Sequence, residues 1–532
     1  MGRLLNAKRF TLATAMLVVA VLGLLPLCVM LLRSVSNSNG SLGFENYAHT
    51  LWRSRPWSLL FNSFVLAGTS TLVAGLMGIP LALVAVKTTV PFRRLIVAIF
   101  CLPLLFPPYV LANGWFHILG RQGLLSRWIG ESGGAATSSW FFAMPGGVLV
   151  LATAFLPVVL LLSIAAISGV NPQMEDAARL HCGWTMVLKS ITLPLGRPGI
   201  VLSVVLTFLL ALGELAAPSF LRISVFPVES FTQFSAFYDV GAATATSVPL
   251  GLIAFLLLIA SRKWMGSGEY HFRWVISGTN QLTPGSMDRW KAAGLLAVAA
   301  MVVILPCGAL LMKGLSFGAI TEAWYRAGDS MAWSLVYSAL AATGITLLGF
   351  FLGYASQRRS IEGSGFISMA TLILFALPGT LIGIGLVTTW NRPLFAWLYA
   401  SPAALLTGLM MQYIAIGERG MASSLTQLSP SLEEAAQIAD AGWFRRVGTI
   451  LVPLLRPSML AVWMLAFILC LRDTSLPLLL SPPGQDTLTA RTLTLMANGS
   501  QELISALCLF SMALPIVPLM IGFVLLRGAR RS

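Results

Sequence analysis

The sequence predicts an all-α polytopic membrane protein with about 12 transmembrane helices, arranged as two parallel six-helix repeats. Its 532 residues are 57% hydrophobic and only 10% charged, and its mean hydropathy is +0.83. Soluble globular proteins carry about 25% charged residues, so this composition argues strongly against a water-soluble fold. Roughly 20 apolar helical residues cross a bilayer core of about 30 Å. Apolar runs of the required kind lie at 10–32, 59–86, 95–119, 144–169, 199–220, 241–261, 292–315, 333–356, 364–390, 402–425, 458–480 and 503–526.

The residues that usually hold metals are scattered along the chain. Its six cysteines form no CxxC pair, and its four histidines do not cluster. This spacing predicts free, buried thiols rather than a disulfide framework or a zinc site. The net charge of +15 is poor support for nucleic-acid binding, which needs a basic face on a soluble domain. We therefore expect a lipid bilayer as the partner of this surface, with no bound metal and no nucleic acid.

The charges outside the apolar runs predict how the chain is oriented in the membrane. The first run follows Arg3, Lys8 and Arg9 and has no small-residue cleavage site before Asn37, so we expect a retained anchor rather than a signal peptide. With the N-terminus placed inside, the inside segments hold 23 of the 34 lysines and arginines. This bias satisfies the positive-inside rule. We predict a multi-pass membrane protein with both termini in the cytoplasm.

The two sets of six runs form an internal repeat. An even number of helices per repeat gives both halves the same orientation, related by an axis along the membrane normal. We predict a first repeat at 1–261, a cytoplasmic linker at 262–291 and a second repeat at 292–532. Five identities share an offset of 259 positions: Glu175 with Glu434, Gly183 with Gly442, Trp184 with Trp443, Pro194 with Pro453, and Pro198 with Pro457.

A long inside loop between the fourth and fifth runs of each repeat predicts a short helix outside the membrane. Acidic residues open the helical stretch in both loops and suit a helix N-terminus, and we expect the prolines to stop the following segment and to start the next span. Such a helix cannot bury a core of its own, so docking is the simplest function. An ordinary cytosolic loop, duplicated with the gene, is the alternative. The residues assigned to docking are Glu175, Asp176, Ala177, Ala178, Gly183, Pro194, Glu434, Ala435, Ala436, Gly442 and Pro453.

These loops resemble the EAA loops of the permease subunits of bacterial binding-protein-dependent ABC importers. In that pattern Glu-Ala-Ala is followed by Gly six residues after the Glu and by Pro nineteen after it. Glu434 with Pro453 matches, and Glu175 keeps its spacing to the proline. Three departures are Asp176 in place of the first Ala, and His181 and Asp440 in place of the Gly. The whole chain resembles two fused permease domains, most of all the ferric-iron type, with thiamine, polyamine and phosphonate permeases as near relatives.

The resemblance implies that the protein lies in a bacterial inner membrane and that both loops are coupling helices. Each would fit a groove on one copy of an ABC ATPase, with Glu175 and Glu434 anchoring the loops in that interface. A periplasmic binding protein would deliver the substrate to the outside loops at 33–58, 120–143, 316–332 and 481–502. The chain has no G-x-x-x-x-G-K-[ST] motif. We therefore expect a transport subunit rather than an enzyme, with no cofactor of its own, and with ATP and Mg on the partner ATPase.

Two carboxylates are predicted inside the membrane at matching places. Glu214 and Asp473 again differ by 259 positions, and ionisable residues at this depth usually face a cavity or a partner. One interpretation is a carboxylate pair that favours a cation such as ferric iron. The alternatives are that each caps a broken helix end, or that Asp473 pairs with Arg472. A role in lining the pathway, or a simple packing kink, is also open for Pro107, Pro108, Asn113 and Pro378.

Two other classes of protein compete with this interpretation. An ion-coupled secondary transporter would also suit twelve spans in two parallel halves, but it would have no use for the EAA-like loops. A membrane-embedded enzyme would need a cluster of His, Asp or Cys near one face, which the sequence lacks. The identity of the substrate is left open between ferric iron, thiamine, polyamine and phosphonate.

Overall fold

The computed structural model describes residues 2–35, 43, 47, 54–88, 90–237, 240–265, 289–358 and 363–529. Within these ranges, nine helices are long and apolar enough to cross a membrane, and three further pairs of helices are bent spans. Together they correspond to the twelve predicted runs, so the all-α polytopic class is confirmed. Residues 266–288 of the predicted linker, and most of the predicted outside loop 33–58, lie outside the described residues.

The first half contains the helices that precede the linker. The long apolar helices among them are the membrane spans. Pro80, Pro157 and Pro249 lie inside such helices, as membrane helices allow. In chain order the elements are α1 (Gly2–Val19), η1 (Ala20–Leu24), α2 (Leu25–Ser34), α4 (Ser54–Lys87), α5 (Arg93–Cys101), η2 (Leu102–Leu105), α6 (Pro108–Leu119), α7 (Ser126–Phe141), α8 (Met144–Ser168), α9 (Pro172–Arg179), α10 (Trp184–Val187), η3 (Leu188–Thr192), α11 (Leu193–Leu212), α12 (Ala216–Phe220), α13 (Phe226–Ser235) and α14 (Val240–Met265).

The second half repeats this order. Its elements are α15 (Arg289–Ala299), η4 (Ala300–Ile304), α16 (Leu305–Gly314), α17 (Phe317–Gln357), α18 (Ser364–Ala376), α19 (Gly379–Trp390), η5 (Pro393–Phe395), α20 (Ala396–Tyr399), α21 (Pro402–Thr426), α22 (Ser431–Ile438), α23 (Trp443–Arg446), η6 (Val447–Leu451), α24 (Val452–Arg472), α25 (Ser475–Leu480), α26 (Leu488–Met496), α27 (Gln501–Ala513) and α28 (Ile516–Ala529).

The prediction that Pro194 and Pro453 stop a helix is wrong. The helical segments run without a break from Trp184 to Leu212 and from Trp443 to Arg472, so both spans begin about fifteen residues earlier than expected. A π-helical turn, η3 or η6, ends two positions before each proline. Its wider i→i−5 hydrogen bonding accommodates a residue that has no N–H and whose ring would clash with an α-helical carbonyl. The turns η1 and η4 precede Pro26 and Pro306 in the same way.

The third and ninth spans are sharply broken at proline. The axis turns by 106° between Arg93–Leu105 and Pro108–Leu119, and by 108° between Ser364–Ala376 and Gly379–Trp390. Pro107 and Pro378 are the extended N-cap residues of the second helix in each pair. A break of this kind frees backbone groups that need protein or water around them, so both breaks lie inside the bundle.

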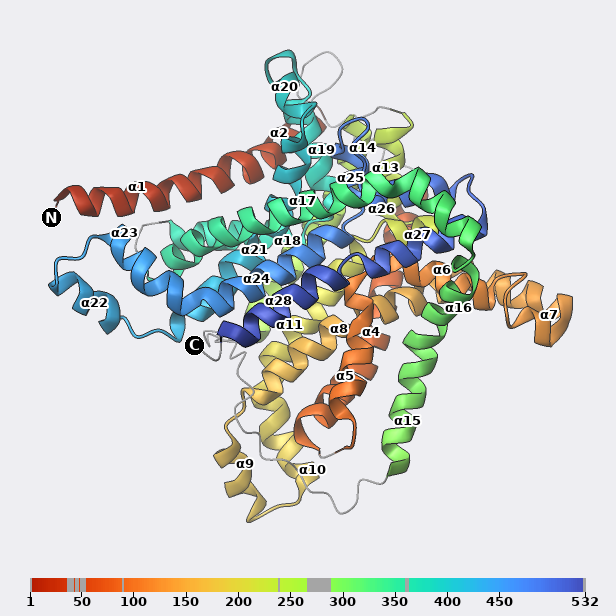
Figure 1. Ribbon diagram of the computed structural model, residues 1–532, viewed down its shortest axis with the longest axis horizontal. Helices are drawn as coiled ribbons and strands as arrows, with labels where there is room; N and C mark the ends of the chain where they lie inside the picture. Colours follow the sequence, from red (N-terminus) through yellow and green to blue (C-terminus); the bar gives the residue numbers. More distant parts are fainter. Residues whose placement is uncertain are drawn as a thin grey trace.

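The two halves are interlocked. Helices α1 and α2 leave the first half and pack against α17 and α19 of the second, while α15 and α16 pack against α5 and α6 of the first. The two halves cross, with α4 and α8 running steeply and α17 and α24 running almost horizontally (Figure 1). Within the second half, α17 and α21 pack closely at glycines: a Cβ added to Gly417 would overlap the backbone carbonyl oxygen of Ile345.

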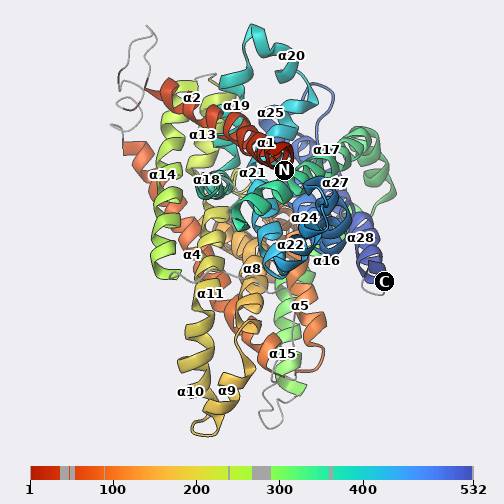
Figure 2. The same cartoon turned by 90° about the vertical axis from the view of Figure 1, so that its left-hand side faces the viewer.

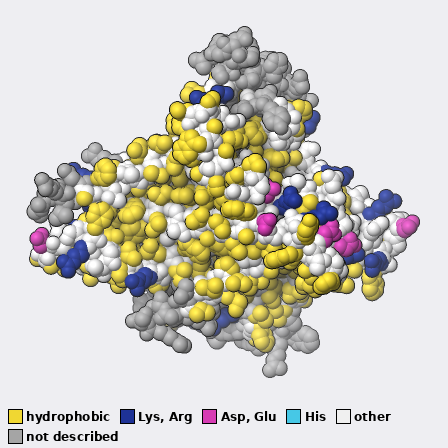
Figure 3. Space-filling model, turned by 45° about the horizontal axis from the view of Figure 1, so that its top comes forward, with side chains coloured by type: hydrophobic (Ala, Val, Ile, Leu, Met, Phe, Trp, Pro, Cys, Tyr) yellow, Lys and Arg dark blue, Asp and Glu magenta, His cyan; other side chains and the backbone are white. Residues whose placement is uncertain are grey.

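The surface matches a membrane environment. Hydrophobic side chains cover a broad central area in Figure 3, and charged side chains gather towards its left and right extremities. Phe61, Leu72 and Leu76 on α4, with Leu340 and Leu347 on α17, are among the exposed apolar residues. A continuous apolar surface of this size indicates contact with lipid.

Candidate coupling loops and an intramembrane cavity

Two short helices project from equivalent places in the two halves. In Figure 1, α9 lies at the bottom end of the first half and α22 at the left-hand end of the second. The turned view brings α22 to the front and leaves α9 at the bottom (Figure 2). The start of α1 lies on the same side as α22 and α23, whereas α7 and α20 lie at the opposite ends of the molecule. The short helices expected in both loops are therefore present, beginning at Pro172 and Ser431.

A buried ion pair holds α9 against its own half. Lys87 Nζ, at the end of α4, lies 2.6 Å from Glu175 Oε2, and the two side chains are 1% and 0% exposed. Thr192 Oγ1, at the end of η3, donates to the other carboxylate oxygen at 2.6 Å. One carboxylate thus ties the exposed helix to the elements on both sides of it.

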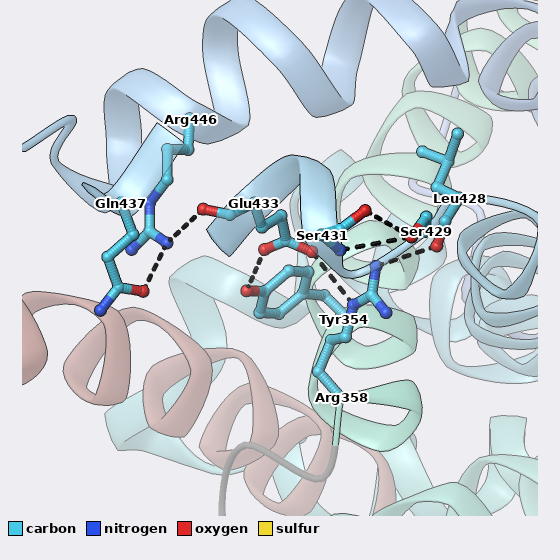
Figure 4. Close-up of polar contacts among 8 residues, drawn as sticks. All are labelled: Tyr354, Arg358, Leu428, Ser429, Ser431, Glu433, Gln437 and Arg446. Carbon is cyan, nitrogen blue, oxygen red and sulfur yellow. Dashed lines mark hydrogen bonds and ion pairs between the residues drawn. The ribbon is translucent and has the colours of Figure 1, made fainter. Parts of the chain in front are cut away.

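A second carboxylate holds α22 in the same way (Figure 4). Tyr354 OH donates to Glu433 Oε2 at 2.7 Å, and Arg358 Nε donates to Oε1 at 3.0 Å. Arg446 closes the loop from the other side, because its Nη1 donates to the backbone carbonyl of Glu433 at 3.3 Å and to Gln437 Oε1 at 3.0 Å. Both loops are therefore fixed by buried carboxylates to the ends of α4 and α17.

The structural equivalent of Glu175 is Glu433 rather than Glu434, which corrects the pairing at an offset of 259. Glu433 is buried, whereas Glu434 and Asp176 face outward. The helices α9 and α22 therefore match at an offset of 258. Of the two residues predicted to anchor an ATPase, Glu175 is enclosed within its own chain and only Glu434 is free to reach a partner.

One extra residue in the second loop restores the offset of 259. Asp440 lies between α22 and α23 with a φ of 55°, a left-handed conformation that Asp tolerates better than most residues. This is the position where the EAA pattern has Gly. His181 has no such backbone conformation among the positive-φ residues, so the first loop turns differently. Gly183 and Gly442 are extended N-caps of α10 and α23 with negative φ.

The outward surfaces of the two short helices match in their apolar residues. Met174 and Leu180 in the first loop are 50% and 82% exposed, and Leu432 and Ile438 in the second are 44% and 88% exposed. Both pairs differ by 258 positions. Each loop therefore presents two large apolar side chains from the same positions.

The four alanines lie on the same short helices. Ala177 and Ala435 are exposed, while Ala178 and Ala436 are partly buried against their own chain. Because alanine side chains are small, they do not project from the helix as far as the large apolar residues beside them. These positions agree at the offset of 258 as well.

A cavity of about 90 Å³ lies where the two halves meet inside the membrane. It is bordered by the breaks in the third and ninth spans, through Pro108 and Pro378, and by the ends of α11 and α24, through Glu214 and Asp473. Four of the six residues predicted to line a pathway are therefore brought to one place. Pro107 is adjacent to the cavity but is not among its lining residues.

The two membrane carboxylates cap broken helices, as one of the alternatives held. Glu214 Oε1 accepts hydrogen bonds from the backbone N–H groups of Ala216 and Ala217 at the start of α12, at 3.1 and 3.5 Å. Asp473 Oδ1 accepts one from Leu476 N at 2.9 Å, and Oδ2 accepts one from Tyr413 OH at 2.7 Å. Capping and lining the cavity are compatible, because each carboxylate stands at the gap between two helices.

Arg472 is placed beside the cavity without forming the suggested pair with Asp473. Among the described residues it makes no ion pair within 4.0 Å, and its Nη1 donates to the backbone carbonyl of Leu104 at 3.3 Å. Its guanidinium also lies 5.6 Å from the ring centroid of Phe155. Arg472 is thereby drawn to the wall formed by the first half.

Asn113 lies elsewhere. Its Nδ2 donates to Cys508 Sγ at 3.4 Å on α27, next to the contact between His117 Nε2 and Ser505 Oγ at 2.7 Å. These side chains form part of the buried contact between α6 and α27. Asn113 is thus not among the lining residues of this cavity, and its contacts agree with the packing alternative.

Sequence reasoning did not identify Lys87, Tyr354 and Arg358 as partners of the loops, nor Gln412 as part of the cavity. Composition presents Lys87 and Arg358 only as two of the inside charges, and the sequence separations of 88 and 75 residues hide their pairing with the loop carboxylates. A polar Gln412 inside an otherwise apolar run was the available signal for the cavity.

Comparisons with known proteins agree with this architecture. The chain is 24% identical over 450 residues to a putative ferric transport system permease protein of Haemophilus influenzae, covering 78% of this chain and 69% of the relative. It is 23% identical over 469 residues to the ferric transport system permease protein of Actinobacillus pleuropneumoniae, covering 83% and 67%. It is 30% identical over 223 residues to the molybdenum transport system permease protein of Escherichia coli K12, covering 39% of this chain and 93% of the relative. No protein-family model matches the chain.

The fold, the paired loops and these relatives define a membrane-spanning transport subunit. The chain belongs to the family of ABC transporter permeases, since it covers nearly the whole of a molybdenum transport permease at 30% identity. Its resemblance to the permeases of binding-protein-dependent importers is thereby confirmed, and it is a multi-pass membrane protein.

Proposed function

We propose that this chain is the fused membrane subunit of an ABC importer that carries ferric iron into the cytoplasm, driven by two copies of a separate ATPase. The observation that carries the docking role is the pair of loops, each fixed by a buried carboxylate and each presenting two large apolar side chains. Met174 with Leu180 would enter one ATPase groove, and Leu432 with Ile438 the other. ATP and Mg reside on the ATPase, and this chain binds no cofactor.

In the proposed cycle, ATP closes the two ATPases, and α9 and α22 move towards each other. Because α10, η3 and α11 form one continuous helical segment, as do α23, η6 and α24, each loop can transmit this movement directly to the cavity. The outside loops receive substrate from a periplasmic binding protein, and both termini lie in the cytoplasm. Support for this orientation comes from the excess of lysine and arginine on the side of the two loops.

Ferric iron as the cargo is supported by relatives that match about four fifths of the chain and are named ferric transport permeases. The molybdenum transport permease matches less than half of the chain, as expected if one repeat corresponds to one such subunit. An oxyanion such as molybdate is therefore the second candidate. Thiamine, polyamine and phosphonate have no support among these relatives.

Two experiments test the proposal. Leu180→Asp combined with Ile438→Asp should abolish co-purification of the ATPase, because both grooves would meet a charge, while the neighbouring exposed substitution Gln173→Asp should not. Uptake of radiolabelled ferric iron in a deletion strain, with and without the restored gene, tests the cargo. Undiminished ATPase binding by the double variant would contradict the docking role, and unchanged iron uptake would contradict the cargo.

A further inference from the structure

The cavity between the two halves contains a buried acceptor without a donor. Gln412 on α21 is 7% exposed, and its Nε2 donates to the backbone carbonyls of Phe375 and Leu377 at 3.3 and 3.1 Å. These two bonds fix the amide orientation. Its carbonyl oxygen Oε1 has no hydrogen-bond partner among the described residues. A buried polar atom of this kind costs free energy unless a ligand or a water satisfies it.

A second acceptor faces the same cavity. Glu214 uses Oε1 to cap α12, whereas its Oε2 has no hydrogen-bond partner among the described residues. Asp473, also on the cavity wall, completes a set of oxygen atoms contributed by both halves. With both carboxylates ionised, they outnumber the single guanidinium of Arg472, and the wall then carries a net negative charge.

The size and chemistry of the cavity select among the candidate cargoes. About 90 Å³ corresponds to roughly three water molecules at about 30 Å³ each. A partly hydrated inorganic ion therefore fits in this space. Carboxylate and amide oxygens are the ligands that hard cations prefer. An oxyanion would find one cationic side chain in this lining, Arg472, and would be repelled by the carboxylates of Glu214 and Asp473.

We propose that this cavity is a transit site for the transported ion, which binds as a small cation to oxygen atoms of Glu214, Gln412 and Asp473. The inference rests on the function proposed above and names the charge class of its substrate. Arg472 keeps the site weak, since a positive charge on the wall opposes tight retention. Weak binding is what passage through a pathway requires.

The test measures initial uptake of radiolabelled ferric iron in the deletion strain, with the full chain or a variant. Glu214→Gln and Gln412→Leu each remove an acceptor with little change in volume. The matched control is Glu418→Gln, because Glu418 lies buried on the same helix as Gln412 and accepts a hydrogen bond from Thr371, away from the cavity. We expect uptake to fall at least tenfold in both cavity variants and less than twofold in the control, with ATPase co-purification retained in all three. Gallium(III), a redox-inactive trivalent cation, should inhibit uptake by the wild-type chain, and molybdate should not.

Other outcomes separate the site from the function. Iron uptake within twofold of wild type in both cavity variants overturns the transit site and leaves the iron importer standing. If Gln412→Leu fails to insert in the membrane, Glu214→Gln decides the question by itself. Uptake of labelled molybdate in place of iron overturns the cation assignment. Failure of the ATPase to co-purify with the wild-type chain overturns the proposed function itself.

Discussion

Removing the carboxylate of Glu175 should release the first loop from the membrane domain. Lys87 Nζ and Glu175 Oε2 are 2.6 Å apart, and at an effective dielectric constant of about 20 two unit charges at that distance attract by about 6 kcal/mol. Desolvation of both groups offsets much of this attraction. Taking away one partner nevertheless costs about 3–5 kcal/mol, because the other charge stays buried and unpaired. Since about 1.4 kcal/mol is a factor of ten, Glu175→Gln should raise the population of the opened loop by about two to three and a half orders of magnitude.

Limited trypsin digestion of inverted membrane vesicles measures this opening. Cleavage after the partly exposed Arg179 requires the loop to open, and its rate follows the opened population when closing is faster than cleavage. Glu434→Gln is the matched control, because Glu434 is exposed and the same change should leave the rate within about twofold, as expected of a surface substitution. Lys87→Met combined with Glu175→Leu should recover most of the protection, since a buried pair can be replaced by apolar residues of similar volume.

The reasoning would be refuted by equal cleavage rates in Glu175→Gln and Glu434→Gln. It would also be refuted if the Lys87→Met and Glu175→Leu double variant were cleaved faster than Glu175→Gln, because an unpaired lysine would then not be the cause.

Three further predictions use the same kind of measurement. Glu433→Gln should lower the free energy of opening the second loop by about 1–3 kcal/mol. The effect should be smaller than in the first loop because Arg358 is partly exposed. The rate of tryptic cleavage within the second loop measures the effect, and a larger effect than that of Glu175→Gln would contradict the ranking. Asp440→Gly should raise the free energy of opening the same loop by up to about 1 kcal/mol, because a φ of 55° strains residues that have a Cβ. Faster tryptic cleavage of this variant would contradict the expectation. Gly417→Ala should lower the yield of monodisperse protein in size-exclusion chromatography, whereas Gly75→Ala, with nothing within 4 Å of its added Cβ, should not; equal yields would show that α17 and α21 can separate at little cost.

Much of the fold could be predicted from the sequence, because a local run of apolar residues is enough to identify a membrane span. Every predicted apolar run corresponds to a helix or to a bent pair of helices. The prediction that Pro194 and Pro453 end a helix is wrong, since the effect of a proline depends on whether the preceding turn widens to a π-helix. The same residue type broke the chain by more than 100° at Pro107 and Pro378. Local sequence says that a proline perturbs a helix, and the surrounding packing decides how.

The sequence by itself determined that this chain crosses a membrane in two similar halves and carries two EAA-type loops, because hydropathy and repeat spacing are properties of neighbouring residues. Only the tertiary structure decided that Glu433, and not Glu434, matches Glu175, and that Glu214, Gln412 and Asp473 share one cavity. These relations join residues that lie between 61 and 259 positions apart along the chain. Which buried charge finds which partner depends on how the helices pack, since packing sets both the distances and the exclusion of water that make such pairs strong.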